Sequence, residues 1–286
     1  MLAEIIAIYS AMAWAGDAVF VRLGTRKSTI FAAMLVSYAL SISLVWIYLL
    51  ATTSLDFLRS PAMIYFLMSG CLQPLFARAL YYEGFNRIGV ARAGPLRGAE
   101  PFFAIAIAIV FLHEDPTLSV YLGTVLIVAS IWMISWRDGA QMKWRLRDAS
   151  LPLGAALVSA VSQTLRKQGL SILPNPFVAS ATVTSTSLVL LLLFVCSSRR
   201  THLLRMKRQS LGFFVCGALI ACSAQVSNFV ALARGDLSVI IPLLNTTPLF
   251  NVIFSAVFLR NIETVTPRIV LGAIVMVTGV ALITLG

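Results

Sequence analysis

The segment GVARAGPLRGAEPFFAIAIAIVFL, residues 89–112, has a second copy in DLSVIIPLLNTTPLFNVIFSAVFL, residues 236–259. Both segments have 24 residues, and seven aligned positions are identical. Two prolines fall at the same offsets in each copy, as Pro95 and Pro101 and as Pro242 and Pro248. The offset of 147 residues is close to half of the 286-residue chain, which indicates a duplicated unit. In a membrane protein, interrupted apolar segments at corresponding places of two halves predict a transporter and its substrate site.

The composition predicts an integral membrane protein. Apolar residues make up 59% of the chain and charged residues 12%, with a mean hydropathy of +0.91, whereas ordinary soluble domains carry about 25% charged residues. The net charge of +11 does not indicate nucleic-acid binding, because the Lys and Arg residues cluster in short gaps between apolar runs, as topology signals do. The first apolar run has no basic segment before it and is expected to remain as a span.

The apolar runs predict an all-α fold of ten transmembrane helices, because each is close to the roughly 20 residues that a spanning helix needs. The expected cores are 3–22, 29–51, 61–82, 89–112, 117–136, 149–168, 176–197, 210–232, 236–259 and 267–285.

Five spans in each half predict two inverted repeats around a central cavity, because an odd number of spans makes the second half enter the membrane in the opposite orientation. The expected units are residues 1–138, a basic linker at 139–148, and residues 149–286. Four spans per half would give parallel repeats instead.

The basic residues predict the orientation. Gaps after odd-numbered spans hold 15 Lys or Arg residues, and the basic side of a membrane protein is normally cytoplasmic. Both termini are then expected on the outer side. The gaps after even-numbered spans hold only four, Arg59, Arg166, Lys167 and Arg234.

Ionisable residues within the fourth span are candidates for function, since a charge inside a membrane is costly. Arg97 and Glu100 are three residues apart and share a helix face. One interpretation is a structural ion pair. The other is that Arg97 meets an anionic group of the substrate while Glu100 orients it or exchanges a proton. Arg92 is a further candidate.

Polar residues of other spans complete the expected substrate site. Trp14 and Asp17 lie near mid-depth of the first span, where Asp17 is either a proton site or a partner of Arg78 or Arg92. The 147-residue offset places Arg78 opposite Gln225 and Tyr81 opposite Asn228, which suggests a cavity lining repeated in both halves. The remaining candidates are Gln163 in the sixth span, and Asn245 and Thr247 in the ninth.

The motifs PLRGAEPFFA…FLHE and PLLNTTPLFN…FL, within two five-helix halves, resemble the EamA branch of the drug/metabolite transporter superfamily. The resemblance covers essentially the whole chain. Glu114 fits the family's acidic residue after the fourth helix, whereas Glu263 is a displaced match in the second half. The resemblance implies ten helices, inverted halves and a central cavity. It also implies export of amino acids or related metabolites, and cytoplasmic termini, in conflict with the distribution of basic residues.

The sequence therefore predicts a secondary transporter of a small polar or amphipathic metabolite in the plasma (bacterial inner) membrane, working by alternating access. An exchanger of anionic or phosphorylated metabolites is the alternative, motivated by Arg92 and Arg97. An intramembrane enzyme and a non-transporting scaffold are the alternatives from other classes. No phosphate-binding loop or metal-ligand spacing is visible, so neither a cofactor nor catalysis is expected. The expected partners are a small-molecule substrate and the lipid bilayer, with proton coupling left open.

Overall fold

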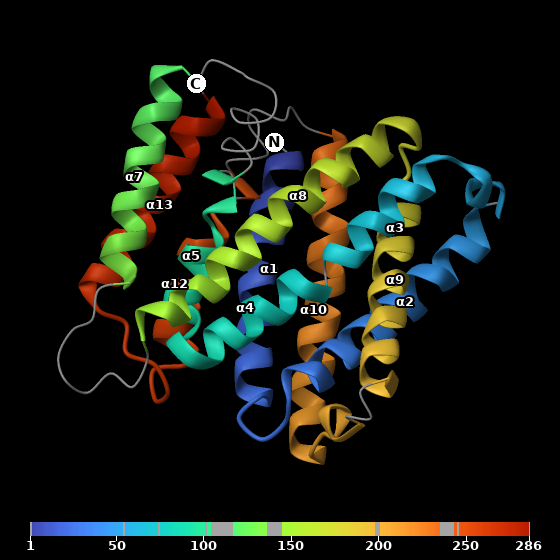
Figure 1. Ribbon diagram of the computed structural model, residues 1–286, viewed down its shortest axis with the longest axis horizontal. Coiled ribbons are helices and arrows are strands. Elements are labelled where there is room, and N and C mark those ends of the chain that lie inside the picture. Colours follow the sequence, from blue (N-terminus) through green and yellow to red (C-terminus); the bar gives the residue numbers. More distant parts are fainter. Residues whose placement is uncertain are drawn as a thin grey trace.

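The computed structural model describes residues 2–53, 55–73, 75–100, 102–103, 117–135, 145–197, 201–234, 243–244 and 246–285 (Figure 1). These residues form helices and turns, without a strand among them. The α-helices are α1 (Leu2–Gly24), α2 (Ile30–Thr52), α3 (Ala62–Leu72), α4 (Leu75–Ile88), α5 (Val90–Arg97), α7 (Leu118–Ser135), α8 (Ser150–Ile172), α9 (Pro176–Ser197), α10 (Arg208–Arg234), α12 (Thr247–Phe258) and α13 (Pro267–Leu285). Short 3-10 helices η1 (Leu55–Arg59), η2 (Leu146–Ala149) and η3 (Thr201–Leu204) lie between them.

A helix occupies the described part of every expected span. The third span differs from the prediction of one continuous helix, because it consists of α3 and α4 with a break between them. Gln73 is extended at this break, with φ −138° and ψ 134°. The residue before a proline is driven out of the helical region by the proline ring, and Pro74 follows Gln73 in the sequence.

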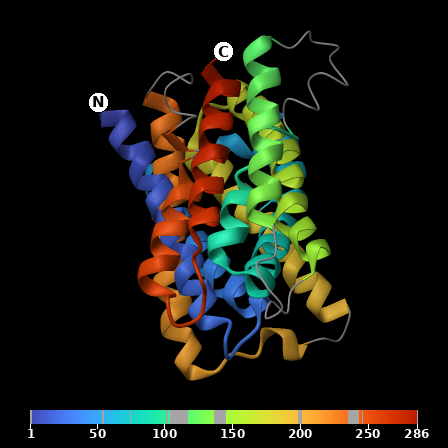
Figure 2. The same ribbon diagram turned by 90° about the vertical axis from the view of Figure 1, so that its left-hand side faces the viewer.

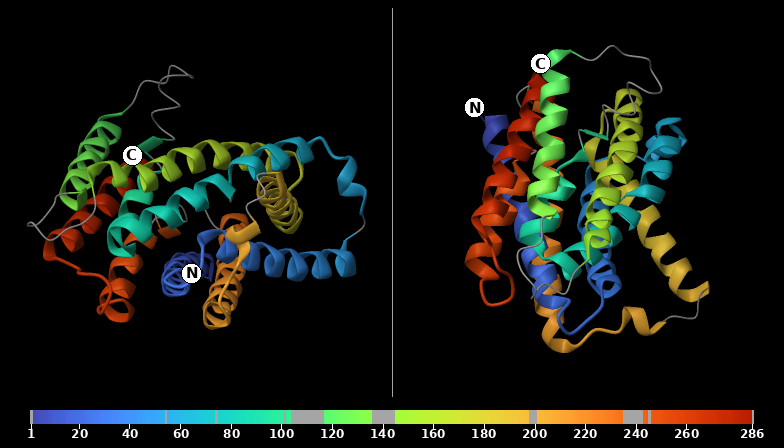
Figure 3. Two further views of the ribbon diagram at one scale, coloured as in Figure 1. Left: turned by 60° about the horizontal axis from the view of Figure 1, so that its bottom comes forward. Right: turned by 60° about the vertical axis from the view of Figure 1, so that its left-hand side comes forward.

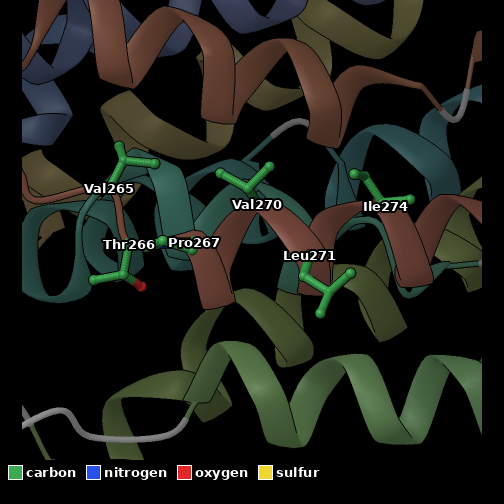
Figure 4. A pocket seen from close by; sticks show the side chains of 6 residues that line it. All are labelled: Val265, Thr266, Pro267, Val270, Leu271 and Ile274. Carbon is green, nitrogen blue, oxygen red and sulfur yellow. The ribbon is translucent and has the colours of Figure 1, made fainter.

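The outer surface of the bundle is apolar, as a lipid-facing surface must be. Among the described residues, five stretches are long and apolar enough to cross a membrane: Leu2–Gly24, Ile30–Thr52, Ala62–Ile88, Pro176–Ser197 and Arg208–Asn228. Large apolar side chains such as Leu2, Ile47 and Trp132 are more than 60% exposed. An open hollow of about 430 Å³ on this surface is lined almost entirely by apolar side chains at the start of α13 (Figure 4). These features fit contact with lipid chains.

The two ends of the chain lie at the same end of the bundle (Figures 1 and 2). α1 leads away from this end and α2 returns toward it, whereas α8 leads toward it and α9 leads away (Figure 1). α7 and α13 pack together as a pair at one edge (Figure 3). The polar residues discussed below come from the other helices.

Small residues allow α1 to pack closely within the bundle. Ala7, Ala11, Ala15 and Ala18 are nearly or completely buried along one side of α1, and α1 packs against α10. Small side chains favour helix association in membranes because they allow close van der Waals contact between backbones.

Two glycines at equivalent places in the halves are each covered by a phenylalanine ring. Gly24 ends α1 against Phe214 of α10, and Gly169 lies near the end of α8 against Phe66 of α3. Both rings are buried. A Cβ atom at either glycine would overlap with the ring, so both positions require a residue without a side chain.

We expect Gly24→Ala to lower the thermal stability of the purified protein. Alanine alone would favour a helix by about 1 kcal/mol over glycine, but overpacking against a buried ring costs about 1–3 kcal/mol. Gly212→Ala in α10 is the matched control, because no atom lies within 4 Å of the added Cβ. Gly24→Ala should therefore melt below the wild type and Gly212→Ala should not. Equal melting temperatures for the two variants would contradict the close packing of Gly24.

Candidate functional site

Asp17 and Arg78 form an ion pair inside the bundle. Arg78 Nη2 donates to Asp17 Oδ2 at 3.2 Å, and the Tyr82 hydroxyl donates to the same oxygen at 3.0 Å. Asp17 is 2% exposed. Of the two partners considered for Asp17, the structure selects Arg78 over Arg92.

Aromatic rings surround the Arg78 guanidinium. Its central carbon lies 5.4 Å from the ring centroid of Trp14, 5.9 Å from that of Tyr38 and 5.4 Å from that of Tyr82. A cation within about 6 Å of an aromatic face is attracted by the ring quadrupole, more strongly where water is excluded. Arg78 Nη1 also donates to Ser37 Oγ at 2.9 Å. The cation is thus held by α1, α2 and its own helix α4.

One oxygen of Asp17 receives no hydrogen bond from the described part of the chain. Oδ1 is buried and unpartnered among the residues that the structure describes. Gly217 of α10 lies beside it, and a Cβ there would approach Oδ1 to 3.2 Å. A buried carboxylate oxygen without a donor is costly, so this oxygen is available to a proton or to a donor group on a ligand.

Tyr81 of α4 and Asn251 of α12 lie next to each other and interact through their side chains. Tyr81 is within electrostatic range of Asp17 and of Arg97. Asn251 of α12 is buried and packs directly onto Gly94 of α5, where a larger residue would overlap with its side chain. Asn251 Oδ1 has no hydrogen-bond partner within the described part of the chain. Polar groups from the two halves therefore meet where α5 and α12 pack together.

Arg97 and Glu100 form the second internal ion pair. Arg97 Nη1 donates to Glu100 Oε2 at 2.7 Å, and each side chain is 20% exposed. Arg97 Nη2 donates to Ser159 Oγ of α8. The predicted pairing within one helix face is confirmed, and α8 is an additional partner that the spacing could not reveal.

Arg166 of α8 is a buried cation at the break in the third span. Its Nε donates to Ser69 Oγ at 2.9 Å and its Nη2 donates to the Gln73 carbonyl oxygen at 3.2 Å. The assignment of Arg166 to a gap between spans was wrong, since it lies within α8 and is 9% exposed. Ser159, Ser162 and Arg166 recur at helical spacing and share one face of α8; this pattern is the sequence signal that could have identified Arg166.

Glu263 binds the N-terminus of α5. Its carboxylate accepts from the backbone N–H groups of Val90, at 2.8 and 2.9 Å, and of Ala91, at 3.2 Å. Arg22 Nε and Ser255 Oγ donate to it at 3.1 and 2.6 Å. A carboxylate is favourable at a helix N-terminus because the first N–H groups have no partner within the helix and carry partial positive charge. Glu263 thus fastens α1, α5 and α12 together.

Gly89 permits this contact. It has a φ of +86°, and a Cβ there would lie 3.0 Å from the Glu263 carboxylate. Glycine adopts positive φ without the steric cost that other residues meet. Sequence reasoning placed Glu263 only as a displaced family match and did not predict its role as the cap of α5.

A second carboxylate acts at the same end of the bundle, outside the spans. Asp148 of η2 accepts from the Arg145 backbone N–H at 2.7 Å and from Arg87 Nη1 of α4 at 3.0 Å. Hydrogen bonds from Arg145 and then from the Arg87 guanidinium hold the pKa of Asp148 below its ordinary value.

The other predicted site residues are dispersed. Arg92 is buried in α5, and Gln163 is exposed on α8, on the same face as Ser159 because four residues span about one turn. Gln225 Nε2 donates to Ser180 Oγ of α9 at 2.6 Å, and Asn228 is half-buried in α10. Thr247 Oγ1 donates to the Leu244 carbonyl oxygen at 2.9 Å. Asn245 and Glu114 lie outside the described residues.

Comparison with known proteins identifies the family. The model of the EamA-like transporter family matches residues 1–136 and 149–285. The chain belongs to the EamA-like transporter family. It is therefore a multi-pass integral membrane protein of a transporter family, and its predicted resemblance is confirmed.

A solved structure described only as "Crystal structure of protein" shares this fold. The TM-score is 0.67 at 13% sequence identity, over 99% of this chain and 97% of the other. At this identity the likeness concerns the fold alone. No curated protein matches the sequence.

We expect Arg97→Gln to abolish transport, because Arg97 is a partly exposed cation at the α5–α8 contact. Removing one member of a buried pair also destabilises a protein, by about 3–5 kcal/mol, so loss of flux in the single variant is ambiguous. The double variant Arg97→Gln with Glu100→Gln removes both charges. It should recover folding, measured by size-exclusion chromatography and melting, while flux in proteoliposomes stays lost. Near-normal flux in the double variant would leave only a structural ion pair.

Proposed function

We propose that this protein is a secondary transporter that moves a small polar metabolite by alternating access, with export of an amino acid or a related compound as the leading function. The observation that carries the proposal is the presence of two ion pairs, Asp17–Arg78 and Arg97–Glu100, and of the buried cation Arg166 within the helices of a transporter family. Ionisable groups within transmembrane helices are costly and mark substrate or ion pathways.

The substrate site in this proposal lies between the two ion pairs. Its lining comprises the predicted residues that belong to the two ion pairs or contact them, together with Asn251, Ser159 and Arg166. The predicted members are Trp14, Asp17, Arg78, Tyr81, Arg97 and Glu100, and the less connected candidates are Arg92, Gln163, Gln225, Asn228, Asn245 and Thr247. Proton coupling is assigned to Asp17, whose Oδ1 accepts no hydrogen bond from the described side chains.

The proposal treats the halves as inverted repeats, residues 1–138 and 149–286, joined by the linker 139–148. The opposite directions of α1 and α8, and of α2 and α9, support this arrangement (Figure 1). So does the pattern of helix contacts. In the two halves α1 corresponds to α8, α2 to α9, α3 with α4 to α10, α5 to α12, and α7 to α13. The contact of α1 with α10 therefore has its counterpart in the contact of α8 with α3 and α4. The remaining contacts, α2 with α9, α5 with α12 and α7 with α13, each join two corresponding helices.

The Glu263 contacts have a specific place in this mechanism. They join α1, α5 and α12 at the end of the bundle opposite the termini (Figure 1). Alternating access requires that such an end opens and closes around a fixed site. We assign this end as the closed one in the present conformation. In this proposal, which follows the distribution of basic residues, this end faces the cytoplasm and both termini lie outside a plasma, or bacterial inner, membrane.

The test is substrate flux through purified protein in proteoliposomes. Vesicles loaded with unlabelled amino acids, one kind per preparation, should take up the same labelled compound by counterflow, because exchange through a carrier needs no external energy source. The flux should saturate and should be equal in the Gly212→Ala control. Protein-free vesicles set the background. Flux at background for every compound, or release of a chemically altered product, would contradict the carrier.

A further inference from the structure

The break between α3 and α4 holds a cation, Arg166, that forms no ion pair with any residue that the structure describes. Arg166 is 9% exposed and its hydrogen bonds go to two neutral oxygens, Ser69 Oγ and the Gln73 carbonyl. None of the ion pairs formed by described residues includes Arg166. Burying a charge costs free energy unless it is paired, so this position calls for an anion.

The same break presents a helix N-terminus. α4 begins at Leu75, two residues after the carbonyl group that Arg166 binds. The first N–H groups of a helix have no acceptor within it, and together with the helix dipole they attract anions. The Gln73 side-chain oxygen Oε1 is buried there without a hydrogen bond to any described residue; as an acceptor it suits a donor such as the ammonium group of an amino acid, and it does not bind the anion itself. Substrate sites of transporters are commonly formed at such interrupted helices.

The local charges fit a group with one negative charge. Glu100 and Arg97 act electrostatically on Arg166, but these two neutralise each other through their 2.7 Å contact, which leaves one positive charge. Arg92 precedes Arg97 by five residues on the same helix and therefore points about 140° away from it. A carboxylate balances one charge, whereas a phosphate monoester carries about −1.5 to −2 at neutral pH.

We propose that the break in the third span binds the carboxylate of the transported substrate, with Arg166 as the anchor and the first amides of α4 as further donors. This assignment rests on the proposed function as a carrier and specifies its substrate as a small carboxylate, amino acids included. A guanidinium holds a carboxylate through two parallel hydrogen bonds. The competing role for Arg166 is purely structural, as a cap on the C-terminal carbonyls of α3.

Matched pairs of probes separate the two roles. Butanoate and L-leucine each have an amide of nearly the same shape, butanamide and L-leucinamide, that lacks the carboxylate. Glycerol 3-phosphate represents phosphorylated compounds. The melting temperature of the purified protein is measured with each probe at equal ionic strength, for the wild type, Arg166→Gln, Arg166→Lys and the control Arg59→Gln. Arg59 is exposed in η1, away from the break.

The expected result is a rise in wild-type melting temperature with at least one carboxylate and none with its amide. The rise should persist in Arg59→Gln and vanish in Arg166→Gln, whatever the variant's own stability. Arg166→Lys keeps the charge without the paired donors, so the apparent affinity should fall about tenfold, as the loss of one charged hydrogen bond implies. This variant carries the test if Arg166→Gln does not fold.

Three results would overturn the assignment: a carboxylate effect unchanged in both Arg166 variants, a stronger effect of glycerol 3-phosphate than of either carboxylate, or no effect of any carboxylate on the wild type. The binding measurement does not depend on transport. Carboxylate binding without flux in proteoliposomes would refute the carrier and keep this site. If the protein transports compounds that lack a carboxylate and binds no carboxylate, the carrier is supported and this site is refuted.

Discussion

An ionised side chain between transmembrane helices has little water to stabilise it, so its counter-charge must come from the protein or from a bound ligand. This constraint organises the interior of the bundle. Asp17 of α1 and Arg78 of α4 satisfy each other across two helices, and the rings of Trp14, Tyr38 and Tyr82 enclose the cation. Arg97 and Glu100 neutralise each other within one chain segment, and Arg97 also donates a hydrogen bond to Ser159 of α8. The positions of α1, α4, α5 and α8 are thereby coupled through charge.

Irregular backbone follows from the same constraint. The interruption at Gln73 frees backbone groups that a membrane cannot solvate, and Arg166 and Ser187 supply donors, to the Gln73 and Gly70 carbonyl oxygens. At the start of α5 the first backbone N–H groups likewise have no acceptor within the helix, and the Glu263 carboxylate accepts from those of Val90 and Ala91. In both places a charged side chain from the second half of the sequence completes a helix end in the first half. A transporter needs such contacts to be specific in geometry and limited in number, so that one end of the bundle can open.

Much of the fold could be predicted from the sequence, because apolar run length and a repeated proline spacing are local and periodic signals. The ten spans and the family resemblance depended on these alone. Pro74 could also have predicted the break at Gln73, because a proline disfavours helical backbone at the preceding residue. The break was missed because the apolar run continues past this point. The site was predicted in part. Arg97 and Glu100 are close in sequence, so helix geometry sufficed to pair them.

Contacts between distant segments could not be deduced in this way. The choice of Arg78 over Arg92 as partner of Asp17, the contact of Ser159 with Arg97, and the cap that Glu263 places on α5 all depend on how helices from the two halves pack. Arg166 was misjudged for a different reason. The adjacent Arg166 and Lys167 near a span end look like a topology signal, and only the serines at helical spacing on the same face indicate that Arg166 points inward.

The most direct test of this account is a double-mutant cycle on the Asp17–Arg78 pair, measured as free energy of unfolding in lipid bicelles. Each single change, Asp17→Asn or Arg78→Gln, leaves one buried charge unpaired and should cost about 3–5 kcal/mol. The double variant should cost about as much as one single change, because no charge remains, which corresponds to a coupling free energy of about 3 kcal/mol or more. Additive losses, with a coupling near zero, would show that the two charges do not stabilise each other and would contradict the account.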